Sequence, residues 1–492
     1  MTLPRLRLRA LALGAVLLSA ITAGTARAAL PSPLPSAVPI GVATVTDCPS
    51  NGVRVPSDYL GLSIEWSMVT HWFGTSRAHV VQPTVALLQS LESSPAAAGV
   101  LRIGGNSQDG YLWNPSGDIK HNKLFEGTIN RGMVDALLEV SRRSGWKIIL
   151  GLNLRSDRPD LAAALTHYVV THDPTSQLLA VETGNEPTVY FGDDGNSYIA
   201  RVDSYVQALQ SDPVTRAVRI AGPSLANRAD LGFLTRMRQS FGPRLPFVTW
   251  HHYANRPTLT GLLSEDVSTE WTDRLDAVRK AAQGTPTRMD EGNSVGTGGL
   301  DKVSNVMGST AWLMDSVLTG AQAGLRGYNV HAWDGYYYPA EKRTAYYTPF
   351  VVRGGLTFPR PGFYAMAMLK DAIGKSFCRT QTAAAPLSSV KTWGLIDPAT
   401  QHVLVYVVNK APQSGGPVVV AAPSGYAGGA VVSRLADPDG CAGRQSEVEG
   451  SRLPTHGQFS WTPASAAAAS GTSSYTVDLA PCQTALLDIT PG

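Results

Sequence analysis

The amino-acid sequence predicts a (β/α)8 TIM barrel followed by a β-sandwich domain. Between about residues 60 and 340, short apolar runs alternate with helical patterns, which is typical of a parallel α/β barrel. After about residue 350 the pattern changes to short β-rich runs separated by Gly, Pro, Ser and Ala, which favours a sandwich. The chain has 492 residues, 43% of them hydrophobic, and is long enough to bury both cores.

Eight runs rich in apolar or β-branched residues supply the expected barrel strands. They are Leu60–Trp66, Val100–Gly104, Trp146–Leu154, Leu178–Glu182, Val218–Gly222, Phe247–His251, Thr287–Glu291 and Gly327–Trp333. Helical patterns lie between them, such as the i, i+3, i+4, i+7 series Met133, Ala136, Leu137 and Val140 and the longer stretch Val303–Leu318. A doubly wound open sheet is the alternative, but no Gly-x-Gly-x-x-Gly follows the first run.

The sandwich is expected to occupy residues 349–492, behind a barrel formed by residues 58–348. A helix at residues 362–373 is expected to pack on the barrel first. Segment 29–57 is expected to add a strand to the sandwich, because one of the four cysteines lies in it and the others follow the barrel. These cysteines are Cys48, Cys378, Cys441 and Cys482. In an exported chain they predict up to two disulfides, whose pairing the sequence leaves open.

The N-terminus has the pattern of a secretory signal peptide. Three arginines precede the apolar stretch Ala10–Ile21, and Ala26-Arg27-Ala28 resembles a cleavage site. We therefore expect residues 1–28 to be removed and the protein to be secreted. An uncleaved anchor is the alternative, but the stretch is too short to span a bilayer. The absence of an Asn-x-Ser/Thr sequon favours a bacterial source.

Loss of the four arginines in residues 1–28 changes the formal charge from +3 to −1. A nearly neutral chain gives no support to broad electrostatic binding of nucleic acid or anionic membranes. We expect a monomer that acts without a metal or cofactor, because the chemistry that the sequence indicates needs only carboxyl groups.

Two glutamates carry that chemistry. Glu186 stands in Gly184-Asn185-Glu186-Pro187 and Glu291 in Asp290-Glu291-Gly292, at the C-terminal ends of the fourth and seventh expected strands. In a barrel these strand ends face each other across the mouth. Hydrolysis of a glycoside with retention needs an acid and a carboxylate about 5–5.5 Å apart. Asp290 competes with Glu291, but side chains alternate along a strand, so only one of the two is expected to point into the pocket.

The motifs resemble those of known glycosidases. Gly184-Asn185-Glu186-Pro187 resembles the acid/base motif of the clan of retaining (β/α)8 glycosidases with catalytic glutamates on strands four and seven. The wider set resembles the heparanase and β-glucuronidase family, glycoside hydrolase family 79. It comprises Ser63-Ile64-Glu65, Leu101-Arg102-Ile103-Gly104-Gly105-Asn106, Thr249-Trp250-His251-His252-Tyr253, and Glu291-Gly292-Asn293-Ser294 with Gly298-Gly299. The resemblance spans residues 58–340, about three fifths of the chain.

The resemblance implies roles for individual residues. Glu186 would be the general acid/base, Glu291 the nucleophile and Asn185 a donor to the sugar 2-hydroxyl. Tyr253 would donate to Glu291 and keep it ionised. Further substrate contacts are expected from residues that end the first two strands, with strand-end capping as the alternative: Glu65, Asn106 and Asp109. The adjacent histidines His251 and His252 should point to opposite faces and have structural roles, without a metal.

A glucuronate carboxylate would also need donors. The resemblance implies backbone amides after the nucleophile and a tyrosine. Gly298 and Gly299 suit the first role, because glycine lets backbone N–H groups approach an anion closely. Of the three tyrosines at residues 336–338 we expect Tyr338 to take the second. No Arg or Lys is indicated, and the tyrosines with Trp333 can alternatively stack on any sugar.

The sequence thus predicts a secreted retaining β-glycosidase, and the resemblance implies an exo-acting β-D-glucuronidase. Its substrate would be a glucuronide or a glucuronate-containing glycan. An endo-acting, heparanase-like enzyme is one alternative, although it would need a basic cleft. A β-glucosidase-type specificity in the same fold is another. A non-catalytic carbohydrate-binding protein is the alternative from a different class.

Overall fold

The computed structural model describes residues 38–94, 97–120, 125–173, 175–334, 345–384, 389–444, 447–448 and 473–492. The expected signal peptide and Tyr338 lie outside these residues. None of the described helices is long and apolar enough to cross a membrane.

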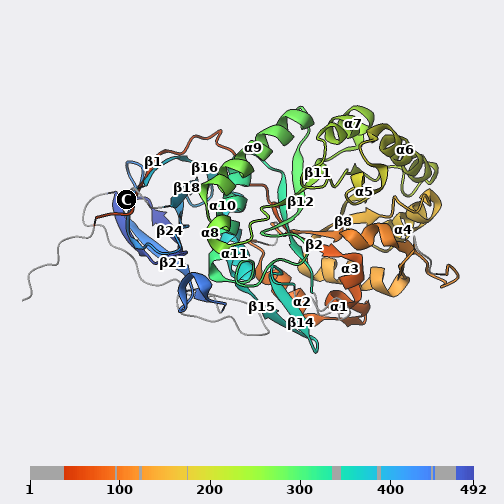
Figure 1. The fold of residues 1–492 in the computed structure, drawn as a ribbon, viewed down its shortest axis with the longest axis horizontal. Coiled ribbons are helices and arrows are strands. Elements are labelled where there is room, and N and C mark those ends of the chain that lie inside the picture. Colours follow the sequence, from red (N-terminus) through yellow and green to blue (C-terminus); the bar gives the residue numbers. More distant parts are fainter. Residues whose placement is uncertain are drawn as a thin grey trace, which may run out of the picture. The chain divides into compact units, whose positions relative to one another are not determined.

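Eight parallel strands form the expected barrel (Figure 1). They are β2 (Leu60–Glu65), β5 (Val100–Gly104), β8 (Lys147–Leu152), β9 (Leu178–Thr183), β10 (Ile220–Ala221), β11 (Val248–Tyr253), β12 (Thr287–Asn293) and β13 (Gly327–Ala332). Their order is β10-β9-β8-β5-β2-β13-β12-β11. An isolated bridge between Leu225 and Trp250 and a 2.8 Å hydrogen bond from His251 N to Leu225 O join the two edges. The predicted fold class is confirmed, although the fifth strand is shorter than expected.

A helix follows each strand and packs around the barrel. The helices are α2 (Gln82–Ser90), α3 (Arg131–Ser144), α4 (Pro159–His172), α6 (Gly195–Ser211), α7 (Gly232–Phe241), α9 (Glu265–Ala282), α10 (Met307–Gln322) and α11 (Pro361–Leu369). Helix α3 shows why the sequence folds this way. Asn130 caps its first turn by accepting from Met133 N at 3.0 Å, Gly145 ends it at φ +67°, and its apolar face is buried. Helix α10 is buried almost throughout, and α11 packs against it.

Shorter elements occupy the loops. They are α1 (Val69–Phe73), β3 (Gly74–Ser76), β4 (His79–Val80), β6 (Tyr111–Trp113), β7 (Gly127–Ile129), α5 (Thr188–Phe191), α8 (Leu259–Leu262) and the hairpin of β14 (Phe350–Arg353) with β15 (Leu356–Pro359). Single 3-10 turns lie at Trp66–Met68, Asn106–Gly110, Gly242–Arg244, Lys370–Ala372 and Gly440–Ala442. The turn at Lys370–Ala372 extends α11 over most of the helix expected at residues 362–373.

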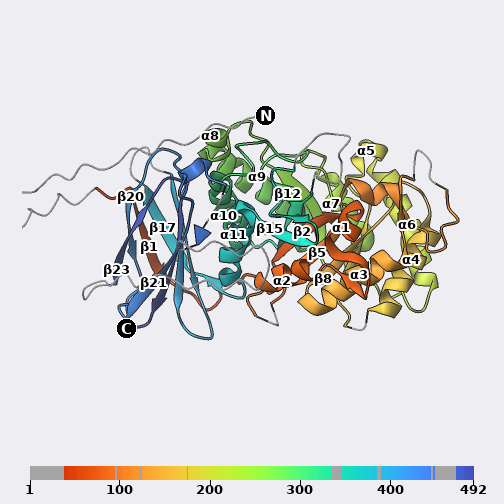
Figure 2. The ribbon, with the colours of Figure 1, turned by 90° about the horizontal axis from the view of Figure 1, so that it is seen from below.

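Two further sheets form the second part of the fold (Figure 2). The four-stranded sheet contains β17 (Arg379–Ala384), β1 (Gly41–Asp47), β20 (Gly416–Ala421) and β23 (Ser474–Leu479), in that order. The six-stranded sheet contains β16 (Ser376–Phe377), β18 (Val390–Ile396), β19 (Val403–Asn409), β24 (Thr484–Thr490), β21 (Gly429–Ala436) and β22 (Glu447–Val448). Valines and leucines of both sheets share one buried core, among them Val405, Val418, Val477 and Leu487.

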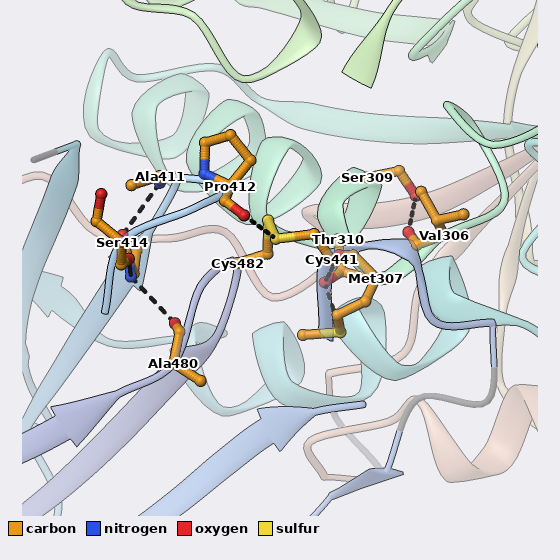
Figure 3. Close-up of a disulfide and its surroundings, with 11 residues drawn as sticks. Val306, Met307, Ser309, Thr310, Ala411, Pro412, Ser414, Cys441, Ala480 and Cys482 are labelled. Carbon is orange, nitrogen blue, oxygen red and sulfur yellow. Dashed lines mark hydrogen bonds between the residues drawn. A yellow bond between two sulfur atoms is a disulfide. The ribbon is translucent and has the colours of Figure 1, made fainter. Parts of the chain in front are cut away.

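Two disulfides fix the cysteines that the sequence left unpaired. Cys48 bonds Cys378, and Cys441 bonds Cys482; Figure 3 shows the second bond. Strand β1 lies directly before Cys48 and pairs antiparallel with β17 and parallel with β20. The N-terminal segment is therefore held in the sandwich by hydrogen bonds along both edges and by a covalent bond.

Candidate active site

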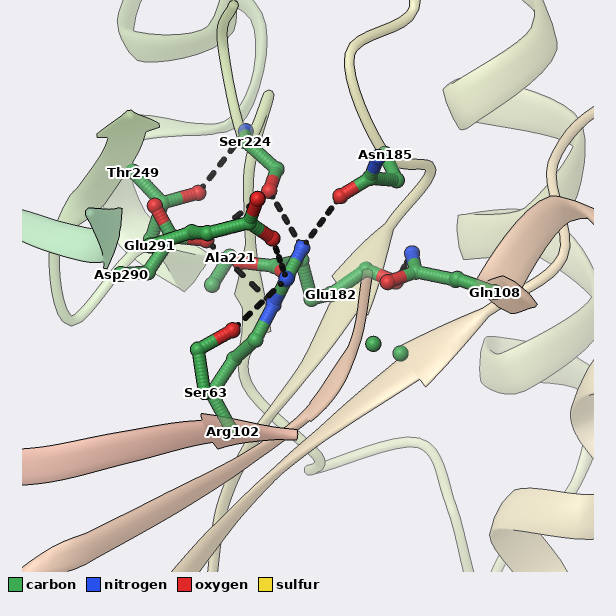
Figure 4. Close-up of polar contacts among 12 residues, drawn as sticks. Ser63, Arg102, Gln108, Glu182, Asn185, Ala221, Ser224, Thr249, Asp290 and Glu291 are labelled. Carbon is green, nitrogen blue, oxygen red and sulfur yellow. Dashed lines mark hydrogen bonds and ion pairs between the residues drawn. The ribbon is translucent and has the colours of Figure 1, made fainter. Parts of the chain in front are cut away.

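Arg102 on β5 is the centre of a buried polar cluster inside the barrel (Figure 4). Its side chain has no exposed surface. Its N–H groups donate to Glu182 Oε2 at 2.7 Å, Ser63 Oγ at 3.1 Å, Glu291 Oε2 at 2.7 Å, Asn185 Oδ1 at 2.8 Å and Ser224 Oγ at 2.6 Å. A guanidinium with five donors thus ties four barrel strands to one point. The motif Leu101-Arg102-Ile103-Gly104-Gly105-Asn106 did not indicate this role of Arg102.

Glu291 stands near the end of β12 and receives donors from several elements. Arg102 Nη1 donates to Oε2, and the Tyr253 hydroxyl donates to Oε1 at 2.8 Å. His331 Nδ1 lies 3.6 Å from Oε2. Burial alone would raise the pKa of Glu291, but the imidazoles of His331 and His251, with Arg102 and Tyr253, hold that pKa well below its usual value. The side chain is therefore an ionised carboxylate, which is the form a nucleophile requires.

A β-bulge directs Asp290 into the barrel beside Glu291. The pairing of β11 with β12 passes from Trp250–Met289 to His251–Glu291, so Asp290 has no partner. Asp290 is fully buried and its Oδ2 accepts from Ser224 Oγ at 2.9 Å, while Glu291 lines the pocket. The expected alternation of side-chain directions along the strand fails here, because the bulge inserts Asp290 as an extra residue. Both carboxylates point inward, although only Glu291 reaches the pocket.

Glu186 follows β9 and lies near Glu291. It adopts φ +45°, and its backbone N–H donates to Ser224 O at 2.9 Å. Its side chain is 26% exposed, and its Oε1 lies 2.8 Å from His251 Nδ1, which is itself 3.9 Å from Glu291 Oε1. The two glutamate oxygens therefore lie at most about 6.7 Å apart, the sum of those distances. This limit shows that both carboxyl groups lie close enough to act on one glycosidic bond.

His251 connects the two glutamates to the buried cluster. Its Nε2 contacts Ser224 Oγ at 2.7 Å, opposite the Nδ1 contact with Glu186. Burial opposes protonation, but Glu291 and Asp290 raise the pKa of His251 well above its usual value. His252 points to the other face and contacts Trp271, and burial lowers its pKa to about 3. The two histidines do face opposite ways, and His251 contacts a candidate catalytic group.

Of the other expected substrate contacts, some line the pocket and others lie behind it and support the residues that do. Glu65 and Asn106 line the pocket, and Glu65 accepts from the backbone N–H groups of Asn106 and Ser107 at 3.0 and 2.7 Å. Asp109 is buried behind it and accepts from Asn185 N at 2.8 Å and Leu154 N at 2.7 Å. Asn185 supports Arg102, and its Nδ2 lies 3.4 Å from Asn106 Oδ1. Neither Asp109 nor Asn185 is among the pocket-lining residues.

The pocket above the cluster has a volume of about 620 Å³. It is lined by Glu65, Ser67, Asn106, Ser107, Tyr111, Glu126, Glu186, Tyr253, Glu291, Gly296, Thr297, Gly298, His331, Trp333 and Tyr347. Gly298 reaches it, whereas Gly299 lies behind and donates its N–H to Gly296 O at 3.3 Å. The sequence indicated a tyrosine directly after the eighth strand and not Tyr347, which lies farther along the chain. Its ring lies 6.4 Å from that of Tyr253.

No metal site accompanies these residues in the part of the chain that the structure describes, because no three His, Cys, Asp or Glu side chains there are grouped to hold an ion.

Comparison with known proteins finds the same fold in glycosidases. No protein-family model matches the chain, and no curated protein does. A 4-O-α-L-rhamnosyl-β-D-glucuronidase from Fusarium oxysporum aligns with a TM-score of 0.69 at 16% identity, over 90% of this chain and all of that one. A GH51 arabinofuranosidase from Xanthomonas axonopodis gives 0.69 at 12% identity, over 92% and 100%. CelM2, a bifunctional glucanase-xylanase from a metagenome library, gives 0.60 at 15% identity, over 92% and 100%.

Proposed function

We propose that the protein is a retaining glycoside hydrolase in which Glu291 is the nucleophile and Glu186 the general acid/base. The observation that carries the proposal is that both carboxyl groups lie against His251 and line the same pocket at the barrel mouth. The different environments of the two groups agree with it, because Glu291 is held ionised by four donors or cations and Glu186 is open to the pocket. The glycosidases that share the fold support it further.

The reaction would be a double displacement. In the first step the Glu291 carboxylate attacks the anomeric carbon, and Glu186 gives its proton to the departing glycosidic oxygen. In the second step Glu186 takes a proton from water as the water attacks the anomeric carbon and releases Glu291. Arg102 and Tyr253 hold the attacking carboxylate in place. Glu186 makes both proton transfers and Glu291 forms the covalent bond, so the proposal requires no metal or cofactor.

For the substrate we propose a terminal β-D-glucuronide, cleaved by exo action. The rhamnosyl-glucuronidase with this fold supports this choice, as does the resemblance of the motifs. Gly298 lines the pocket, where its backbone can approach an anion, and Tyr347 offers a phenol. Tyr338 remains a proposed contact of the carboxylate, whereas Gly299 donates its N–H to Gly296 O and would support the loop behind Gly298. We also propose that the protein is secreted, which its two disulfides support.

The first experiment is to measure release of p-nitrophenol from the β-D-glucuronide, the β-D-glucoside and the α-L-arabinofuranoside at equal concentration. We expect a strong preference for the glucuronide. Preference for the glucoside or the arabinofuranoside would agree with the proposed glycosidase activity but overturn the proposed specificity for glucuronides. Activity on none of them, with cleavage of a glucuronate-containing polysaccharide, would indicate endo action.

Substitution of the nucleophile tests the catalytic assignment. Glu291→Gln keeps the shape but cannot attack the sugar, so kcat should fall on the order of a thousandfold or more while glucuronide binding, measured by calorimetry, persists. Glu270→Gln is the matched control, because Glu270 is an exposed glutamate on α9. Unchanged turnover in Glu291→Gln would contradict the assignment. Binding without turnover in the unmodified protein would favour a carbohydrate-binding protein.

A further inference from the structure

Two fully buried carboxyl groups lie beneath Glu291, and neither has a place in the proposed reaction. Glu182 on β9 and Asp290 on β12 both have no exposed surface. Glu182 Oε2 accepts from Arg102 Nε at 2.7 Å, and Asp290 Oδ2 accepts from Ser224 Oγ at 2.9 Å. The same Arg102 Nε lies 3.5 Å from Asp290 Oδ2. Both carboxyl groups are thus anchored through one oxygen to the same cluster.

The second oxygen of each carboxyl group needs a hydrogen-bond donor. Glu182 Oε1 and Asp290 Oδ1 are buried, and among the described residues neither accepts a hydrogen bond from a conventional donor. Arg102 Nε lies 2.7 Å from Glu182 Oε2 and 3.5 Å from Asp290 Oδ2, so the two carboxyl groups are neighbours, and a hydrogen bond between them would give both remaining oxygens a partner. Two carboxylates can form such a bond only when one of them carries the proton. A single proton between the two oxygens would satisfy both.

The charges around the pair require the same arrangement. Among the residues that the structure describes, Arg102 is the one guanidinium in contact with Glu182, Asp290 and Glu291 together. His251 from β11 lies 3.8 Å from Asp290, Arg288 from β12 interacts with Asp290 through space, and Tyr198 from α6 faces Glu182. Glu182 has its ion pair with Arg102, which Asp290 and Glu291 also contact, so three ionised carboxylates would share one guanidinium. Buried carboxyl groups respond to such crowding by binding a proton.

We propose that Glu182 and Asp290 share one proton, and that Glu182, as a neutral acid donating to Asp290, positions Arg102 against Glu291. Burial and the neighbouring Asp290 raise the pKa of Glu182 to about 8, which agrees with this geometry. His251 and Arg102 outweigh burial and lower the pKa of Asp290. The catalytic consequence rests on the proposed function. The shared proton does not, because it is a property of the folded chain.

Loss of the proton would weaken the hold on the nucleophile. When the pair becomes doubly ionised, a third anion competes for the Arg102 donors that now point to Glu291 and Asn185. Activity should then fall on the alkaline side. Glu182→Gln removes this step, since its amide oxygen can accept from Arg102 and its NH2 group can donate to Asp290 at every pH.

The decisive experiment compares the pH dependence of the melting temperature of the full chain and its Glu182→Gln variant. An unfolded glutamate releases its proton near pH 4.3, whereas folded Glu182 retains it to about pH 8. The wild type therefore loses this stabilisation as pH rises through that window, and the variant does not. We expect the variant's melting temperature to rise relative to the wild type by roughly a few degrees between pH 5 and 8, then to level off. If the difference in melting temperature between the variant and the wild type stays constant across this pH range, the proposal of a shared proton is wrong.

Two further measurements make the outcome independent of folding and of activity. If Glu182→Gln does not fold, the infrared carbonyl band of a buried protonated carboxyl is followed in the wild type, where it should disappear between pH 6 and 9. Its absence at pH 6 overturns the proposal. In the folded variant, kcat at pH 6 should stay within a few-fold of wild type and the alkaline limb should move upward. Glu270→Gln should show neither change. A pH-dependent melting difference without any hydrolysis would overturn only the proposed function.

Discussion

At the scale of single residues, the hydroxyl of Tyr253 offers a clean test of how Glu291 is kept ionised. It donates to Glu291 Oε1 at 2.8 Å from a half-buried position in the pocket lining. Tyr253→Phe removes one hydrogen bond to a charged acceptor, worth about 1.5–3 kcal/mol. We expect kcat/KM to fall roughly tenfold to a hundredfold. Because the donor lowers the pKa of Glu291, its loss should raise that pKa and move the acid limb of the pH profile to higher pH.

A matched control separates this effect from the loss of any tyrosine hydroxyl. Tyr475→Phe removes a hydroxyl that donates to Tyr426 O at 2.8 Å in the sandwich, away from the pocket. Steady-state kinetics across pH should show no shift for this variant. If Tyr253→Phe lowers activity without moving the acid limb, Tyr253 positions Glu291 but does not set its ionisation.

The sequence indicated residues at strand ends better than residues that act across the barrel. Glu186 and Glu291 were found because each follows an apolar run and stands beside Pro or Gly. Arg102 lies within such a run, and nothing local reveals that its side chain reaches Glu291, 189 positions later. The inward turn of Asp290 depends on a bulge, which is a property of strand pairing. Tyr347 lies in a loop, at no fixed spacing from a strand.

At the scale of elements, the loop between β12 and α10 shapes the pocket through its glycines. Gly298 adopts φ +88°, and a Cβ there would meet Trp333 Cζ3 at 2.7 Å. Gly298→Ala should therefore strain the loop, displace Trp333 and lower kcat/KM by roughly tenfold or more. Gly354→Ala is the control, since Gly354 also has positive φ, +58°, but open space around it. Equal activity of the two variants would show that strain alone matters and that Trp333 does not move.

The opposite end of the barrel depends on Asp58, which joins the starts of three strands. It pairs with Arg326 before β13 at 2.9 Å and with Lys147 on β8 at 3.0 Å. Burial would raise the pKa of Asp58, but the hydrogen bond from Arg326 and the charge of Arg288 lower it to about 2. The resulting stabilisation, about 2 kcal/mol, is present above the unfolded pKa of about 3.9 and lost as pH falls toward 2.

Asp58→Asn removes this pH-dependent part of the stability. The difference in free energy of unfolding between the wild type and the variant should narrow by about 2 kcal/mol between pH 5 and pH 2. Denaturant unfolding at several pH values measures it. If the difference in free energy of unfolding does not change with pH, Asp58 contributes only hydrogen bonds that the amide of the asparagine variant can replace.

Most elements followed from local pattern, and the exceptions have a physical reason. The eight apolar runs all became strands, because a buried parallel strand needs only a short β-rich stretch. The run at residues 218–222 gave only Ile220–Ala221, since the chain then leaves the ladder and bonds β11 through Leu225. Strand β1 pairs with β17 and β20, which lie more than 300 residues later in the chain. Only the cysteine pattern indicated that the N-terminal segment joins the sandwich.

At the scale of the whole molecule, the barrel and the sandwich share a buried ion pair. Lys410, directly after β19, places its Nζ 2.5 Å from Asp315 Oδ2 on α10, and Ser268 of α9 donates to the same oxygen at 2.7 Å. The Lys410 side chain has no exposed surface. Removing one partner leaves a buried charge unpaired, which costs about 3–5 kcal/mol. Lys410→Met should therefore lower the melting temperature markedly.

An exposed pair between the same two parts of the fold provides the control. Lys391 of β18 contacts Glu265 of α9, whose side chain is 61% exposed. Exposed pairs contribute at most about 1 kcal/mol, so Lys391→Met should change the melting temperature little. The double variant Lys410→Met with Asp315→Leu should recover most of the loss, because it removes both buried charges. If the double variant is as unstable as Lys410→Met, the lysine stabilises the interface by packing its alkyl chain, and the charge of Asp315 is not the cause.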